Sequence, residues 1–281
     1  MADENTTSDL LAQNEIDTIS TPQVDTSKER ASDSSKAQSF IINSSVNNGS
    51  FEGSFFEGGT FENWRTIGDT SIETKDIGIP PTDGEFQALI TNGFSDAGGS
   101  VEESDLSQFI DLPSGSLDAL LGGDATEGSG IKQIFNAQAG DILEFDFSFL
   151  TNEGTPSSTF NDSAFFSVGG FTQQLADTSD STFSDQSVER FFQATETQPK
   201  KILIQQAGTY ELGFGIVDLS DTVVDSGLLI DDVTLTSTGA SPFSTESLTV
   251  EGGNNTISPE VDFILSTNGL EAVGGSSNTR Q

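Results

Sequence analysis

Short apolar runs that alternate with polar residues dominate the chain from Phe40 onward. Clusters of Gly, Asn, Asp and Ser separate these runs, and this pattern is typical of strands joined by turns. It predicts strands at residues 86–91, 131–136, 142–150, 164–168, 188–194, 201–205, 209–217 and 228–236. A set of short strands of this kind favours an all-β fold, an antiparallel β-sandwich.

Two segments indicate which side chains face the core, because successive side chains of a strand point to opposite faces. The apolar set in residues 142–150 is Leu143, Phe145, Phe147 and Phe149. The corresponding set in residues 209–217 is Tyr210, Leu212, Phe214 and Ile216, with Gly213 and Gly215 on the opposite face. Helical periodicity is limited to a single predicted turn at residues 116–121.

The two ends of the chain differ from this region. Residues 1–38 are rich in Ser, Thr, Asp, Glu, Asn and Gln, which predicts a disordered leader, since little apolar surface offsets the entropy of ordering. Residues 239–281 return to Gly, Ser, Asn and Thr, and we expect a tail with a role in assembly or export. The folded domain is therefore predicted at residues 39–238.

The amino-acid composition limits the catalytic groups and metal ligands that the chain can supply. The 281 residues include 45 acidic and 10 basic side chains, a formal net charge of −35, and neither histidine nor cysteine. Imidazole bases, thiol nucleophiles, zinc thiolate clusters and disulfides are thereby excluded, so any catalysis would depend on carboxylates. The 22 phenylalanines predict one hydrophobic core, because each buried ring contributes roughly 1.5–3 kcal/mol.

The negative charge also bears on partners and location. It disfavours nucleic acid and membrane insertion, since phosphates are bound by Lys and Arg and no run of about 18 apolar residues occurs. Divalent cations, glycans or copies of this chain are the expected partners. The first 20 residues lack the features of a Sec signal, so we expect an extracellular or cell-surface protein exported without one. An acidic cytoplasmic protein is the alternative.

One motif set resembles the galactose-binding-like jelly-roll domains. The chain has Asn-Gly-Ser-Phe-Glu at residues 48–52, Trp64 after a glycine-bearing link, and an Asp-Asp pair, Asp231 and Asp232, in an apolar strand. The resemblance implies that Glu52 ligates a structural calcium ion and that the first and last strands are neighbours, so that Asp231 and Asp232 are candidate ligands of the same ion. Two adjacent edge strands can supply the six to eight oxygens that Ca²⁺ takes.

A second motif set looks like a recurrent cyanobacterial and PEP-CTERM-type extracellular domain. It comprises a Phe-Leu-Thr-x-Glu strand end, an Asn-Asp pair, and a Phe-Gly-Ile-Val-Asp segment that leads to Asp-Ser. Its candidate cation ligands are Glu153, Asp162, Asp218, Asp221 and Asp225. Turn capping by these aspartates is the competing interpretation. The signal peptide and arginine-rich anchor typical of PEP-CTERM proteins do not appear, so their sorting is not carried over.

These observations lead to a calcium-stabilised surface module for structure or adhesion, with self-assembly as a further hypothesis. The alternative is a carbohydrate-binding module, which needs an exposed aromatic platform or a groove. Trp64 is the sole tryptophan and is the candidate for stacking on a sugar, although core packing is the other interpretation. A polysaccharide-active enzyme is the least favoured hypothesis, because 45 acidic residues produce accidental carboxylate pairs.

Overall fold

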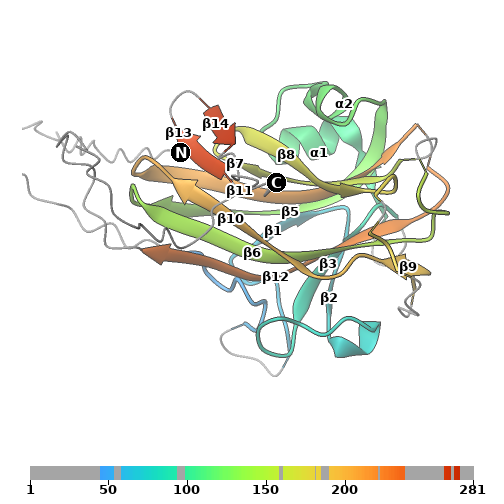
Figure 1. The fold of residues 1–281 in the computed structure, drawn as a ribbon, viewed down its shortest axis with the longest axis horizontal. Coiled ribbons are helices and arrows are strands. Elements are labelled where there is room, and N and C mark those ends of the chain that lie inside the picture. Colours follow the sequence, from blue (N-terminus) through green and yellow to red (C-terminus); the bar gives the residue numbers. More distant parts are fainter. Residues whose placement is uncertain are drawn as a thin grey trace, which may run out of the picture. The chain divides into compact units, whose positions relative to one another are not determined.

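Two β-sheets pack face to face in the part of the chain that the structure describes (Figure 1). The computed structural model describes residues 45–53, 58–93, 99–157, 161–180, 182–184, 190–220 and 222–237, together with two short strands between residues 263 and 272. These residues belong to one compact unit, residues 41–281. The predicted leader and Asp221 lie outside the described residues.

The six-stranded sheet has the order β1-β5-β11-β7-β8, with β4 paired to β5. Its strands are all antiparallel to their neighbours. They are β1 (Arg65–Ile67), β4 (Val101–Glu102), β5 (Ala125–Ala137), β7 (Ser163–Val168), β8 (Phe171–Asp177) and β11 (Gly208–Leu219).

The eight-stranded sheet has the order β14-β13-β10-β6-β12-β3-β2, with β9 paired to β6. Its strands are β2 (Asp69–Glu73), β3 (Gln87–Thr91), β6 (Asp141–Thr151), β9 (Gln193–Ala194), β10 (Gln198–Ile204), β12 (Ser226–Ser237), β13 (Phe263–Ser266) and β14 (Gly269–Ala272). Strand β13 runs parallel to β10, and the other described pairs of this sheet are antiparallel. The predicted tail thus contributes two strands.

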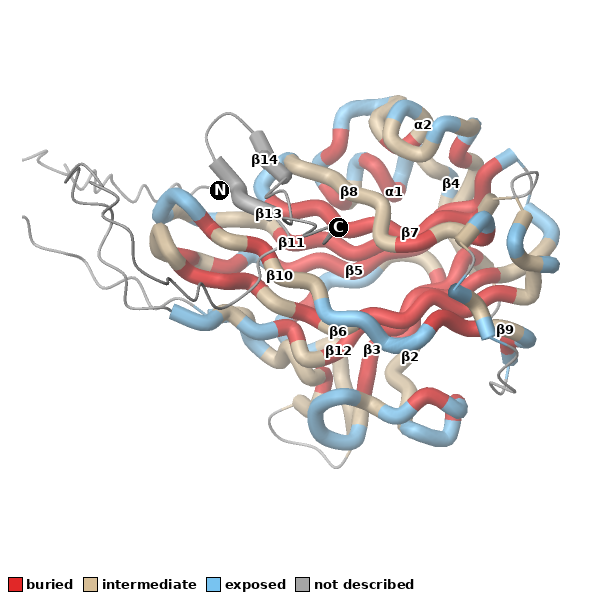
Figure 2. Tube along the Cα trace, in the orientation of Figure 1, coloured by how far each residue is buried: buried red, intermediate tan, exposed pale blue. Residues whose placement is uncertain are grey.

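The core lies between the sheets, and Figure 2 shows burial concentrated on the central strands β5, β6, β7, β11 and β12. The predicted core face of β6 is confirmed, because its four apolar residues are buried; on β11, Leu212, Phe214 and Ile216 are buried, and Tyr210 is partly buried and packs against the core. Phe145 meets Phe214 edge to face at 4.7 Å, which joins the two sheets directly. The antiparallel β-sandwich predicted from the sequence is therefore confirmed.

Two short helices cover the outer face of the six-stranded sheet (Figure 1). They are α1 (Glu103–Phe109) and α2 (Ser116–Leu121), and a 3₁₀ turn lies at η1 (Lys75–Ile77). Leu106 and Leu117 belong there to a buried apolar cluster that also contains Phe165 of β7. Gly215 makes room for that ring, because a Cβ at Gly215 would lie 2.5 Å from the Phe165 side chain. Neither α1 nor α2 is long and apolar enough to cross a membrane.

The predicted elements differ from the observed ones mainly at the sheet edges. The strand expected at residues 188–194 is reduced to the two residues of β9 in the described part of that segment. Helix α2 coincides with the expected turn at residues 116–121, whereas the sequence did not predict helix α1 or strands β1, β2, β4, β8, β13 and β14. Strands β1, β2, β4 and β8 carry few large apolar residues, and β13 and β14 have four residues each, so alternation does not reveal them.

Candidate functional site

Trp64, the predicted stacking residue, lies inside the sandwich. It is 7% exposed, its ring centroid is 5.4 Å from that of Phe51, and its Nε1–H donates to the Asn48 carbonyl at 2.9 Å. A ring enclosed in this way presents no face to a sugar. The stacking role is therefore corrected to the alternative interpretation, core packing.

The opening segment lies beside the last long strand of the sandwich, as expected. The backbone N–H of Val233 in β12 donates to the Gly49 carbonyl at 3.1 Å. The approach is close enough that a Cβ at Gly49 would lie 1.9 Å from the Val233 carbonyl oxygen. Glycine at residue 49 thus lets the segment that carries Glu52 lie against the middle of β12, which is far away in sequence.

Two of the predicted calcium ligands hold the same loop, residues 82–86. Glu52 Oε1 accepts the backbone N–H groups of Glu85 at 2.7 Å and Phe86 at 2.8 Å. Asp231 Oδ2 accepts the N–H groups of Thr82 at 2.7 Å and Asp83 at 2.9 Å, and also the Thr82 hydroxyl. The carboxylates of Glu52 and Asp231 therefore converge on one loop from two elements.

The two aspartates of the β12 pair differ in environment. Asp231 is 3% exposed, and burial raises its pKa to about 6 although hydrogen bonds from Asp83, Asp232 and Thr82 oppose the shift. Its second oxygen, Oδ1, is buried and accepts no hydrogen bond from the described residues. Burial also raises the pKa of Asp232, with a contribution from the negative charges of Asp146, Asp83 and Glu144.

Asp162 and Asp218 meet at a buried amide in another part of the sandwich. The Asn92 side-chain NH₂ donates to Asp162 Oδ2 at 3.0 Å and also to Asp218 Oδ1. The Ser226 hydroxyl donates to the same Asp162 oxygen at 2.6 Å, and the Ser226 N–H donates to Asn92 Oδ1 at 2.7 Å. These carboxylates act here as acceptors that tie β7, β11 and β12 together through Asn92.

The remaining predicted ligands lie in loops. Glu153 follows β6, and its backbone N–H donates to Thr151 Oγ1 at 2.9 Å. Asp225 precedes β12, and burial raises its pKa, helped by the charges of Asp69 and Glu127. Among the described residues, no three acidic side chains are grouped so that they could hold a metal ion.

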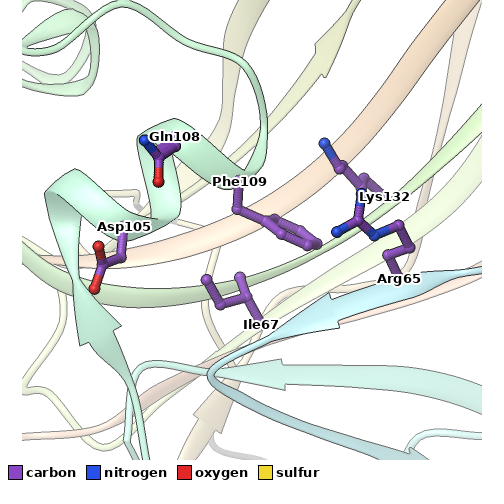
Figure 3. Close-up of a pocket in the computed structure, with 6 residues that line it drawn as sticks. All are labelled: Arg65, Ile67, Asp105, Gln108, Phe109 and Lys132. Atoms are coloured by element: carbon purple, nitrogen blue, oxygen red, sulfur yellow. The ribbon is translucent and has the colours of Figure 1, made fainter. Parts of the chain in front are cut away.

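The structure reveals a groove that the sequence did not, and we call it the α1 groove (Figure 3). It is a hollow of about 350 Å³ beside helix α1, lined by Arg65, Ile67, Asp105, Gln108, Phe109 and Lys132. Figure 3 shows Arg65 and Lys132 on one side of Phe109, with Asp105 and Gln108 on the other side. The groove thus combines an aromatic ring with charged and amide groups, as ligand sites do.

Two cations share this groove. The Arg65 guanidinium carbon lies 5.8 Å and Lys132 Nζ lies 5.0 Å from the Phe109 ring centroid. Lys132 is paired with Glu211 at 2.9 Å. Among the residues that the structure describes, the side chains of Arg65, Asp105 and Gln108 have no hydrogen-bond or ion-pair partner. Their polar groups are available to a ligand.

Sequence reasoning missed the groove because its residues come from three separate segments. The signal available in the sequence was the scarcity of basic residues, 10 in 281. In so acidic a chain, each basic residue outside the termini could have been examined for a carboxylate partner. The register that places Arg65 directly opposite Lys132 in the β1–β5 pair is not visible in the sequence.

No family model matches the chain, and no curated protein matches it. Solved structures similar to it include TmCBM61 in complex with β-1,4-galactotriose, with 14% identity, a TM-score of 0.36 and coverage of 70% of this chain and 99% of that one. TmCBM27, a carbohydrate-binding module that recognises mannan, has 16% identity, a TM-score of 0.29 and coverage of 62% and 88%.

A cleaved adhesin domain of Lys-gingipain from Porphyromonas gingivalis has 12% identity, a TM-score of 0.33 and coverage of 63% of this chain and 92% of that one. The structural neighbours thus include carbohydrate-binding modules and adhesin domains. At these identities and TM-scores, the likeness carries no argument about what this chain binds. The resemblance to cyanobacterial and PEP-CTERM-type proteins stays a prediction.

Proposed function

We propose that this chain is a carbohydrate-binding module and that the α1 groove is its glycan site. The observation that carries the proposal is the partly exposed ring of Phe109 between Arg65 on one side and Asp105 and Gln108 on the other, three side chains without a hydrogen-bond or ion-pair partner among the described residues. Sugar rings offer apolar C–H faces for an aromatic ring and hydroxyl groups for carboxylate and amide side chains. Exposed Ile134, on the same face of β5 as Lys132, extends this surface along the strand.

The composition of the groove favours binding over catalysis. Glycoside hydrolysis uses two carboxyl groups about 5–9.5 Å apart. Asp105 is the one carboxylate lining the groove in the described part of the chain. The carboxyl groups with raised pKa, those of Asp225, Asp231 and Asp232, belong to other parts of the sandwich. We therefore propose a role in holding a glycan.

Phe109→Ala tests the groove. We expect this variant to lose about tenfold or more in affinity for the glycans that the full chain retains on a glycan array, because it removes the aromatic contact. Isothermal titration calorimetry with the array's strongest oligosaccharide measures the loss. The matched control is Phe192→Ala, which removes a ring that is 75% exposed and does not line the groove. Equal affinities of Phe109→Ala and the full chain would refute the assignment.

We also propose that Ca²⁺ stabilises the fold at the loop of residues 82–86. Support comes from Asp231 Oδ1, a buried carboxylate oxygen without a described donor, which is the type of ligand that Ca²⁺ takes. Asp231 and Glu52 would supply carboxylate oxygens, and backbone carbonyls and water would complete the shell. When bound, the ion would supply the positive charge that the described surroundings of Asp231 lack.

Asp231→Asn tests this second proposal. With one site of dissociation constant near 10⁻⁴ M, about 10 mM Ca²⁺ should add roughly 2.7 kcal/mol to the free energy of unfolding of the natural chain. We expect the variant to lose that gain, because the amide carries no charge, while its oxygen still accepts from Thr82 and Asp83. Thermal unfolding in EDTA and in Ca²⁺ measures both. Exposed Asp76→Asn is the control and should keep the calcium response.

Asp231 should also make the free energy of unfolding depend on pH when calcium is removed with EDTA. The pKa of Asp231 rises from 3.8 to about 6 on folding, so the folded state holds its proton more tightly between these values. Its contribution to stability is present in full below pH 3.8 and is lost as pH rises through 6, a change on the order of 2 kcal/mol. Asp231→Asn should remove this component from a urea-unfolding pH series. A series identical in both proteins would contradict it.

Placement outside the cell and association between copies of the chain stay predictions from the sequence. A calcium titration followed by light scattering measures the association.

A further inference from the structure

We propose that the α1 groove selects glycans that carry uronic acid residues, with Arg65 binding the carboxylate of the sugar. This inference rests on the proposed glycan site and adds the class of sugar. It follows from the placement of two cations in a chain whose net charge is −35.

Arg65 and Lys132 are directly opposite each other in the antiparallel β1–β5 pair. Side chains that face each other across such a pair lie on the same face of the sheet, and like charges at these positions are destabilising. Glu211 neutralises Lys132, and Arg65 has no carboxylate partner among the described residues. One positive charge therefore remains at this end of the groove.

This arrangement is unusual because carboxylates outnumber cations by 45 to 10 in the sequence. Arg65 is exposed, and among the described lining residues no carboxylate lies on its side of Phe109 to act as its counterion. An anionic group on a ligand would supply it. The charge pattern thus favours a negatively charged sugar over a neutral one, because association adds a counterion that folding alone does not provide.

The position of the aromatic ring favours a carboxylate attached directly to the sugar. The guanidinium carbon lies over the Phe109 ring, 5.8 Å from its centroid, so a sugar that packs beside this ring would have a carboxylate on its own ring carbon within reach of Arg65. The planar fork of arginine matches the two oxygens of a carboxylate. A sulfate ester is held one oxygen farther from the ring, and we therefore commit to the uronate.

At the other side of Phe109, Asp105 and Gln108 lie on helix α1 with exposed side chains (Figure 3). A carboxylate accepts hydrogen bonds from sugar hydroxyls, and an amide both donates and accepts them. A uronic acid sugar has a carboxylate for Arg65 and hydroxyl groups for these two side chains. The division of the groove into a cationic side and a polar side thus matches the two kinds of group on one sugar.

The test uses galacturonate, mannuronate and glucuronate trimers, the methyl ester of each, β-1,4-galactotriose as a neutral sugar, and a sulfated galactan oligosaccharide. All titrations contain EDTA, so that calcium cannot bridge ligand and protein carboxylates. We expect at least one uronate trimer to bind about tenfold or more tightly than its methyl ester, because the ester lacks the charge. Arg65→Gln should lose about ten- to hundredfold in affinity for that trimer, and Arg65→Lys should lose less.

Arg190→Gln is the matched control, since Arg190 is exposed and does not line the groove, and its affinity should equal that of the natural chain. Two results together would overturn the uronate assignment and leave the glycan site intact. The acid and its ester would bind with equal affinity, and the affinity would be unchanged in Arg65→Gln but weakened in Phe109→Ala. Tighter binding of the sulfated oligosaccharide would also overturn it. Failure of every sugar to bind, both here and on the array, would overturn the uronate assignment and the glycan site together.

Discussion

Replacing Asn92 with alanine is expected to lower the free energy of unfolding by about 3 kcal/mol or more. Asn92 is 1% exposed, and its amide donates to two carboxylates, Asp162 and Asp218, that are themselves almost fully buried. Alanine removes a donor from each carboxylate and leaves the Ser226 N–H without its acceptor. Urea unfolding followed by circular dichroism measures the loss.

Asn152→Ala is the control for this effect. Asn152 also bonds through both ends of its amide, to the Arg190 carbonyl and the Phe192 N–H, but these contacts are exposed to solvent. We expect a loss of about 1 kcal/mol or less there, because water replaces the lost partners. If both variants lost the same free energy, the buried carboxylates would not depend on Asn92.

The second large effect is expected for Gly49→Ala, at about 3 kcal/mol. The added Cβ would lie 1.9 Å from the Val233 carbonyl oxygen, so the opening segment must move away from β12. That movement would break the hydrogen bond from Val233 to Gly49 and displace the neighbouring Asn48 carbonyl, which accepts from Trp64. Thermal unfolding followed by the fluorescence of Trp64 reports both changes.

Gly154→Ala is the matched control, because no atom lies within 4 Å of a Cβ built at Gly154. We expect a change within about 0.5 kcal/mol. If Gly49→Ala unfolded at the same temperature as the natural chain, β12 would not hold the opening segment in place.

The central strands could be predicted from the sequence because their side chains alternate strongly. Strands β6 and β11 place phenylalanine and aliphatic residues at every second position, and only one face of each can then lie in the core. Edge strands such as β2, with the sequence Asp-Thr-Ser-Ile-Glu, bury less and carry no such pattern. Helix α1 has seven residues, too few for a periodic signal.

The candidate sites divide in the same way. Glu52 and Asp231 could be chosen as candidates because the motif that resembles the jelly-roll domains includes both the opening segment and the last long strand. The motif does not show that both side chains bind the loop of residues 82–86. The pairing of Asp162 with Asp218 depends on Asn92, which no motif included. The α1 groove depends on strand register and on helix placement, and neither property can be read from the residues around Phe109.

Strand β13 protects the end of β10, residues 202–204, from pairing with other chains. On one side β10 pairs with β6, and on the other side β13 occupies the backbone groups of residues 202–204. Without it, that border of the sheet would present an uncovered row of amide and carbonyl groups, which is a template for aggregation. At these three residues the border passes instead to β14, which is only four residues long, and short edge strands offer little to an incoming chain.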